Sequence, residues 1–411
     1  MNQHDIDILR PLAQRYHELA NDPVNEERMK RARSNNDLKP VRPLVLIAEV
    51  PWHEMNFDGS LTLQCEDPDA RGMEDFFRKT IYQWEHFQVD MFLYDAYYVS
   101  KAYDDSGIGM GVSERSETSD EKNNIYSHYY IDQLDSEEKL ELLHAPVITA
   151  RPDLDAMRVQ KAQEAFGDIL PVRTRGDFLY FAPWDKIVRL HGVENSLCDL
   201  AAEPEFMHAV IKRFAEIYMA RVDSMNEQHL FDNDVPHVHC TPGLSDDLDA
   251  LAAQGLAGTS GCTWFRSMAQ SFSTISPKMH DEFDIQYTIP LAKKFGLTYY
   301  GCCEPLYDRL DIITKIPNLR KIGVSAWSNM EVSAEFMGSN YVFSRKPNPA
   351  QVAVSVDEDV VRKDISRAIE VCQKYNCPCD ITLKDISTVS YKPENLFKWA
   401  KIAEETIDRY Y

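Results

Sequence analysis

Short apolar runs alternate with amphipathic segments from residue 44 to the C-terminus, and this alternation most narrows what the chain can fold into. Several runs are almost continuously apolar, which is typical of strands buried on both faces. Strands that alternate with helices predict a parallel sheet. In a chain of 411 residues, the pattern favours an α/β fold of the (β/α)₈ TIM-barrel type. The candidate strands are 44–50, 91–99, 168–174, 235–240, 260–266, 297–303, 321–326, 340–344 and 379–383.

Nine candidates exceed the eight strands of a barrel, and we expect 235–240 or 321–326 to be the extra one. Residues 1–40 are polar and amphipathic, which predicts an N-terminal helical arm ahead of a barrel domain of residues 41–411. Residues 100–135 are polar and contain three glycines. Because this insertion is too long for an ordinary connection, we expect it to be either a lid or a subunit contact.

Composition excludes several classes of function. The formal net charge of −22 disfavours binding to nucleic acid and to anionic membrane surfaces. No stretch of 18 consecutive apolar residues is present, so we expect no membrane span. The nine cysteines are odd in number and scattered, which is typical of free thiols in a reducing cytoplasm. We therefore expect a cytoplasmic protein that acts on a small molecule.

Chemically active side chains recur where the candidate strands end. In a (β/α)₈ barrel these ends meet on one face and carry the active site. Cysteine, histidine and tryptophan are more frequent there than at ordinary strand ends. The candidates are Glu49, Trp52, His53, Tyr97, His239, Trp264, Arg266, Cys302, Cys303, Glu304, Trp327, Arg345, Lys384 and Asp385.

The sequence Cys302-Cys303-Glu304 is the strongest of these features. Thiolate, imidazole and carboxylate groups are the ligands that zinc takes in proteins. We therefore expect Cys302, Cys303, Glu304 and His239 to be candidate metal ligands. The alternative is that either cysteine is only a small buried apolar residue, as free cysteines often are.

Three stretches of the chain resemble the uroporphyrinogen decarboxylase superfamily. They are "FAPWDKIVRLHGVENSLCDLAAEPEFMHAVIKRF", "SMAQSFSTISPKMHDEFDIQYTIPLAKKFGLTYYGCCEP", and the tail "MGSNYVFSRKPNP" followed by "PENLFKWAKIAEE". The resemblance covers residues 40 to 410 and implies a (β/α)₈ barrel, with a homodimer as the family habit. The decarboxylase branch carries an arginine-rich motif after the first strand, where this chain has "EVPWHEMNFDG".

The resemblance is therefore closer in character to the second branch, the corrinoid-linked methyltransferases and demethylases. That branch binds zinc through H-x-C on one strand and a cysteine on the last strand. In this chain the segment that corresponds to the H-x-C motif is Gly301-Cys302-Cys303-Glu304. The last strand ends in Lys384 and Asp385 rather than in a cysteine. The resemblance implies a methyltransferase with zinc and with a cobamide carried by a corrinoid-binding partner protein.

This resemblance implies methyl transfer between a small methylated substrate, an aryl methyl ether or a methylamine, and the corrinoid. Zinc would polarise the substrate heteroatom, and cobalt(I) would take the methyl group. Trp52, Tyr97, Trp264 and Trp327 would pack the substrate, with Arg266 and Arg345 as further contacts. Glu49 or Asp385 would protonate the departing oxygen, with His53 and Lys384 as further catalytic candidates.

Two alternatives stay open. The first is a metal-free decarboxylase or other lyase acting on a small carboxylic acid, with the carboxylate held by Arg173, Arg266 or Arg345. Asp95 or Lys384 would then handle the proton. The second is a barrel that has lost its chemistry and serves as a binding or assembly subunit.

Overall fold

The central element is a parallel sheet of seven strands, in a computed structural model that describes residues 1–118 and 126–411. Its order is β1-β15-β14-β13-β12-β11-β8, so the first strand of the chain lies beside the last. In a TIM-like barrel the first strand likewise lies beside the last, and the other strands follow in sequence order. The strands are β1 (Leu44–Ile47), β8 (Leu179–Phe181), β11 (Trp264–Ser267), β12 (Leu297–Tyr300), β13 (Leu319–Val324), β14 (Val342–Arg345) and β15 (Cys379–Leu383).

The sheet is open where a closed barrel was predicted. Within residues 1–118 and 126–411, no strand pairing joins the edges β1 and β8. The candidates 91–99 and 168–174 instead supply β2 (Tyr97–Ser100) and β7 (Val172–Arg175), which pair in parallel with each other outside the sheet. The second strand of the sheet along the chain is β8, an edge strand of three residues that the apolar pattern did not single out. Apolar pattern predicts a strand, but it does not specify the strand's partner.

The structure also shows which of the two expected extra strands, 235–240 or 321–326, lies outside the central sheet. Segment 321–326 belongs to β13, which lies in the middle of the sheet, so its prediction as the extra strand was wrong. Segment 235–240 contributes only β9 (His237–Val238), which pairs antiparallel with β10 (Thr241–Pro242). This segment therefore lies outside the central sheet. His239 lies in the short turn between β9 and β10.

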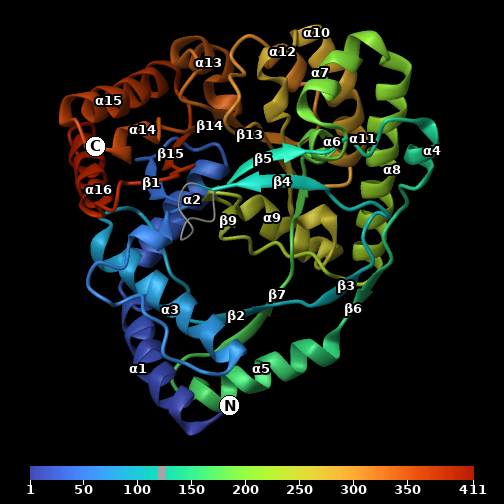
Figure 1. Cartoon of the computed structure of the whole chain (residues 1–411). Coiled ribbons are helices and arrows are strands. Elements are labelled where there is room, and N and C mark those ends of the chain that lie inside the picture. The colour runs from blue at the N-terminus through green and yellow to red at the C-terminus, as the bar shows by residue number, and fades with distance from the viewer. Residues whose placement is uncertain (119–125) are drawn as a thin grey trace.

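Helices cover the sheet and build a second core beneath it (Figure 1). Helices α8 (Pro204–Glu227), α15 (Glu358–Tyr375) and α16 (Glu394–Ile407) are the longest of those around the sheet. The shorter ones are α4 (Glu137–Glu141), α6 (Pro183–His191), α7 (Val193–Ala202), α9 (Asp246–Leu251), α10 (Pro277–His280), α11 (Gln286–Ala292), α12 (Leu310–Ile313), α13 (Met330–Met337) and α14 (Ala350–Ala353).

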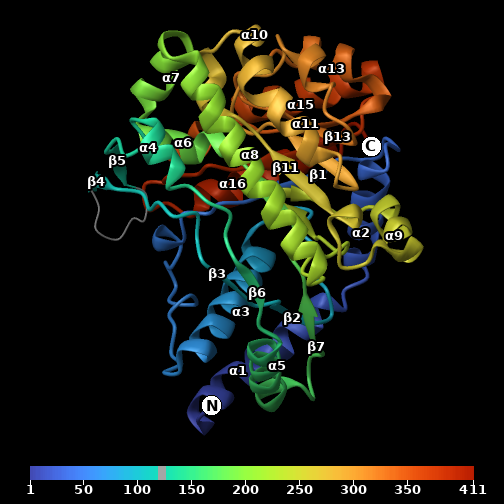
Figure 2. The ribbon, with the colours of Figure 1, turned by 90° about the vertical axis from the view of Figure 1, so that its right-hand side faces the viewer.

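The second core lies among α1 (Gln3–Ala20), α3 (Pro68–His86) and α5 (Pro152–Phe166), with Leu9, Phe77 and Phe166 fully buried in it. In both views these helices and the β2–β7 pair sit below the central sheet (Figure 2). The predicted single arm is thus two helices, α1 and α2 (Val24–Asn36), and α1 is packed against the body of the protein. None of the described helices combines the length and apolar character needed to cross a bilayer.

The insertion 100–135 contains short strands. Strand β3 (Tyr103–Asp105) pairs antiparallel with β6 (Ile148–Ala150), and β4 (Glu114–Glu117) pairs antiparallel with β5 (Ser127–Tyr130). Residues 119–125 of this insertion lie outside the described residues. The lid and the subunit contact both stay predictions.

The side chain of Asp90 covers the open edge of β1. Its backbone N–H donates to the Val45 carbonyl at 2.8 Å, and its carboxylate accepts the Val45 N–H at 2.9 Å. Arg31 and Arg42 donate to the same carboxylate at 2.6 and 3.1 Å. Burial alone would raise the pKa of Asp90, but the two guanidinium groups and the Val45 N–H hold this pKa below its usual value. Asp90 thereby forms hydrogen bonds with the backbone groups of Val45 that a neighbouring strand would otherwise pair with.

We expect Asp90→Asn to lower the free energy of unfolding by about 2–4 kcal/mol at neutral pH, because it removes the charge that two partly buried arginines share. Since the pKa of Asp90 is depressed in the folded state, its stabilisation holds above about pH 4 and is lost as the pH falls through the folded value. Urea unfolding at several pH values measures both effects. Asp95→Asn is the matched control: Asp95 is exposed, and its loss should stay within about 0.5 kcal/mol. Equal effects of the two substitutions would contradict the role of Asp90.

Candidate active site

The carboxyl ends of β1, β12 and β15 bring thiols, carboxyl groups and an amine together. Glu49 follows β1, Cys302 and Cys303 follow β12, and Lys384 and Asp385 follow β15. All three strands run parallel in one curved sheet, so their ends open toward the same side.

Gly301 allows β12 to turn directly into the cysteine pair. Its φ of 92° lies in the left-handed region that favours glycine, and a Cβ at this position would lie 2.3 Å from a methyl carbon of Leu306.

Cys302 is the centre of the cluster. Its sulfur is 3.3 Å from the Lys384 Nζ, 3.5 Å from the Cys303 Sγ and 3.7 Å from the His239 Nε2. The thiol of Cys303, the imidazole of His239, and the cations of Arg266 and Lys384 together hold the pKa of Cys302 well below its ordinary value, against the opposing effect of burial. These groups therefore favour the thiolate form of Cys302.

Cys303 has the opposite protonation state. Its thiol donates to Asp385 Oδ2 at 2.6 Å, and the neighbouring Cys302 thiolate together with burial raises the pKa of Cys303. The opposite shifts favour a proton on Cys303 and the negative charge on Cys302. The Lys384 ammonium lies 3.7 Å from the Cys303 sulfur and donates to Asp385 Oδ1 at 2.7 Å.

Glu49 and Asp385 form a second pair with divided roles. The Asp385 N–H donates to Glu49 Oε2 at 2.9 Å, and the Glu49 Oε1 lies 3.6 Å from the His239 Nε2. Burial and the neighbouring Asp385 raise the pKa of Glu49. Burial also disfavours the charge on Asp385, but hydrogen bonding with Glu49 and the charge of Lys384 lower the pKa of Asp385 to about 2. Asp385 is therefore the carboxylate, and Glu49 is the group that can carry a proton.

Three residues of the cluster have left-handed backbone conformations. The φ angles are 52° at Glu49, 59° at His239 and 57° at Asp385. Such conformations are uncommon for residues with a Cβ, and they concentrate at functional sites, where the surrounding structure holds them. Here they turn three side chains from separate segments toward one point.

Two further acids lie near the thiolate. Glu304 is buried, and its Oε2 accepts the Cys302 N–H at 2.9 Å. Burial and the Cys302 thiolate raise the pKa of Glu304. Asp185, in the first turn of α6, has its pKa raised to about 6 by burial and by the charges of Glu304 and Cys302.

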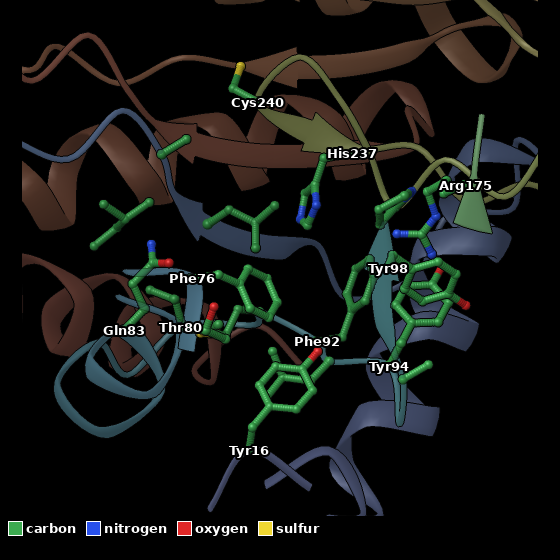
Figure 3. A pocket seen from close by; sticks show the side chains of 18 of the residues that line it. Tyr16, Phe76, Thr80, Gln83, Phe92, Tyr94, Tyr98, Arg175, His237 and Cys240 are labelled. Atoms are coloured by element: carbon green, nitrogen blue, oxygen red, sulfur yellow. The ribbon is translucent and has the colours of Figure 1, made fainter. Parts of the chain in front are cut away.

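A pocket of about 450 Å³ adjoins the cluster at His239. It lies between the edge strand β1 and the β2–β7 pair, on the side where the sheet is open. Aromatic side chains dominate its walls (Figure 3). Its residues include Tyr16, Phe76, Phe92, Tyr94, Tyr98, Thr80, Gln83, Arg175, His237, His239 and Cys240.

Several predicted substrate contacts lie away from the cluster. Trp264 is fully buried in a separate core group and donates to the Gly243 carbonyl at 2.6 Å. Tyr97 packs on Phe76, Phe77 and Phe166 in the lower core. Trp52 packs edge-on against Tyr82 of α3. The first two are thus core aromatic residues, placed there by packing that strand-end position does not reveal.

Of the remaining predicted residues, one lies beside the cluster, and the others have no hydrogen bond or ion pair with it in the part of the chain that the structure describes. Arg345 is buried and donates to Asp364 at 2.6 Å, which holds it against α15, and Trp327 is 69% exposed. His53, in the short helix Trp52–Glu54, lies 3.5 Å from Glu54. Arg266, in contrast, belongs to the cluster's surroundings. Its guanidinium carbon lies 4.1 Å from the ring centre of Tyr299, and its charge helps to lower the pKa of Cys302.

Sequence reasoning missed Asp185, Tyr180 and Met268. Met268 packs directly against Cys302, and the Tyr180 ring lies 5.8 Å from that of His239. Asp185 had one available signal, since it follows a proline at the start of a helix after an apolar run. Tyr180 and Met268 belong to strands or strand ends whose positions in the sheet only the fold establishes.

The donor types fit zinc, but their arrangement does not. Within the described part of the chain, no three histidine, cysteine, aspartate or glutamate side chains are placed to hold a metal ion. The Lys384 ammonium, at 3.3 and 3.7 Å from the two sulfurs, supplies the positive charge there. Of the four predicted ligands, the Cys302 sulfur lies near the side chains of Cys303 and His239, and Glu304 accepts the Cys302 N–H.

Comparison with known proteins adds little about the reaction. No protein-family model matches this sequence, so the family resemblance stays a prediction. No curated protein matches it either. Among solved structures, a methyltransferase from Methanosarcina mazei is similar, with a TM-score of 0.49 and 12% identity over 93% of this chain and 99% of that chain. A likeness this distant carries no argument about activity.

We expect Lys384→Met to raise the pKa of Cys302, because it removes the cation 3.3 Å from the sulfur. The ultraviolet absorbance of the thiolate, taken as the difference from Cys302→Ser, should titrate with a midpoint higher by about 1–3 pH units. Lys384→Arg should retain most of the wild-type midpoint. Lys392→Met, in the exposed loop after β15, is the control that should leave it unchanged. An unchanged midpoint in Lys384→Met would contradict the ion pair.

Proposed function

We propose that this protein is a methyltransferase that takes the methyl group of a small methylated substrate at Cys302. The observation that supports it is the Cys302 sulfur itself, which lies within 3.7 Å of Lys384, Cys303 and His239. A thiolate is a soft nucleophile suited to displacement at a methyl carbon. His239 also lines the aromatic pocket, so a ligand in that pocket lies next to the nucleophile.

In the proposed step, the Cys302 thiolate attacks the methyl carbon while the bond from that carbon to the substrate heteroatom breaks. The products are Cys302 methyl thioether and the demethylated substrate, whose heteroatom keeps the electron pair. Glu49 supplies the proton to that heteroatom, because burial and the neighbouring Asp385 raise its pKa and so favour its protonated form. Lys384 and Asp385 stay charged and hold the cysteine pair in position.

The methyl group must then leave Cys302 for a stronger nucleophile. A corrinoid in the cobalt(I) state, carried by a partner protein, would supply that chemistry, as the family resemblance implies. The corrinoid partner, the methylated substrate and the homodimer are proposals that stand on the sequence.

Zinc also stays a prediction from the sequence, and no step above is assigned to it. Elemental analysis of the purified protein decides the matter. One zinc per chain that is lost in Cys303→Ala and kept in Cys198→Ser would return a metal to the mechanism. Cys198 is the matched control because it is an exposed thiol on α7.

A metal-free lyase acting on a small carboxylic acid is the second candidate. Two buried cations, Arg266 and Lys346, support it, since neither makes an ion pair with an acidic side chain in the described residues. A substrate carboxylate would satisfy them. Release of carbon dioxide that depends on Arg266 and persists in Cys302→Ser would favour this candidate over methyl transfer.

Single-turnover labelling tests methyl transfer. We incubate the protein with anisole and, separately, trimethylamine, each with deuterated methyl groups, and expect one labelled methyl group on the peptide that contains Cys302. Cys302→Ser should abolish the label, and Glu49→Gln should slow labelling by roughly 10²–10⁴-fold. Cys198→Ser should label as the wild type does. Labelling that persists in Cys302→Ser, or that falls on other residues, would contradict the proposal.

A further inference from the structure

The pocket beside His239 is aromatic and is not built for a cation. Its walls contain Phe76, Phe92, Tyr94 and Tyr98, and none of its lining residues is an aspartate, a glutamate or a lysine. Its single lining residue of permanent charge is Arg175. A volume of about 450 Å³ suits one substituted aromatic ring.

Two of the aromatic faces that an ammonium ligand could use, those of Tyr94 and Tyr98, already carry a cation. The Arg175 guanidinium carbon lies 3.5 Å from the ring centre of Tyr98 and 4.8 Å from that of Tyr94. The protein's own cation thus makes the cation–π contacts of this pocket. A methylammonium group in this pocket would find the ring faces of Tyr98 and Tyr94 occupied and would lie near the like charge of Arg175.

Arg175 is held in place and keeps an open donor. Its Nη2 donates to Asp234 at 2.9 Å, and Asp234 also accepts the Tyr94 hydroxyl at 2.6 Å. The Arg175 Nε is buried and has no hydrogen-bond partner among the described residues. A buried donor without a partner is costly, and a carboxylate is the acceptor that a guanidinium binds most strongly.

The rest of the pocket is neutral. His237 stacks on Phe92 with ring centres 5.3 Å apart, and burial and the charge of Arg175 lower the pKa of His237 to about 4, so its imidazole carries no charge. Gln83 and Thr80, from α3, lie at the opposite end from Arg175 and Tyr98 (Figure 3). A ligand with an anionic group at one end and a neutral polar group elsewhere on the ring matches this distribution.

We infer that the pocket binds an aromatic carboxylate of the benzoate class, with its carboxylate on Arg175 and its ring among the aromatic side chains. A methoxy substituent that reaches toward His239 would be the methyl donor, and this part of the inference rests on the proposed function. Of the two substrate types that the sequence left open, the pocket favours the aryl methyl ether over the methylamine.

Calorimetric titration of the full chain with para-methoxybenzoate tests the inference without turnover. We expect saturable binding to the wild type that Arg175→Gln weakens by about 10–100-fold. Arg158→Gln, at an exposed arginine on α5 that does not line the pocket, should bind as the wild type does. Equal affinities of the wild type and a folded Arg175→Gln variant would overturn the inference.

A comparison of ligands on the wild type keeps the test valid if Arg175→Gln does not fold. Para-methylanisole has the same shape but lacks the carboxylate, and it should bind at least about 10-fold more weakly. Tetramethylammonium should not compete. Equal binding of the two aryl ethers, or tighter binding of the ammonium ion, would overturn the inference. Binding of para-methoxybenzoate without labelling of Cys302 would contradict the proposed function alone, and labelling from trimethylamine without benzoate binding would contradict the inference alone.

Discussion

The contact between the Lys384 ammonium and the Cys302 thiolate is the interaction on which the site depends. Both side chains are almost completely buried, and a buried charge is tolerated only when it is paired and hydrogen-bonded. Lys384 also reaches Asp385 and Glu49, so one cation links the thiol pair to the carboxyl pair. Its charge, together with the Cys303 thiol, His239 and Arg266, lowers the pKa of Cys302, and together with Glu49 it lowers the pKa of Asp385.

The open sheet supplies the second half of the site. A closed barrel would have filled the space beside β1 with another strand. Here the two runs that were expected to close it pair with each other, and Asp90 satisfies part of the exposed edge. The space between β1 and the β2–β7 pair is then lined by aromatic side chains and by Arg175. The pocket and the thiol cluster thus meet at His239, which lines the pocket and lies beside the Cys302 sulfur.

Strand-end reasoning predicted Glu49, His239, Cys302, Cys303, Lys384 and Asp385, and the structure brings all six together. Five of the six meet because parallel strands place their carboxyl ends at one edge, and His239 reaches them from the turn between β9 and β10. It did not separate these residues from Trp264 and Tyr97, which also follow apolar runs but face cores. Which way a side chain faces depends on the neighbouring helices, and a single sequence does not specify them.

The sequence by itself determined the class of the fold, the parallel direction of the strands and the residues available for chemistry, because apolar periodicity and local residue types are short-range properties. Only the tertiary structure decided that the sheet is open, that β8 takes the place expected for 168–174, and that Arg175 lies over Tyr98 and Tyr94. It also brought Lys384, His239 and Arg266 to Cys302, where they lower the pKa of that cysteine. These outcomes depend on contacts between segments far apart in the chain, where distances of a few ångströms set both pairing and charge.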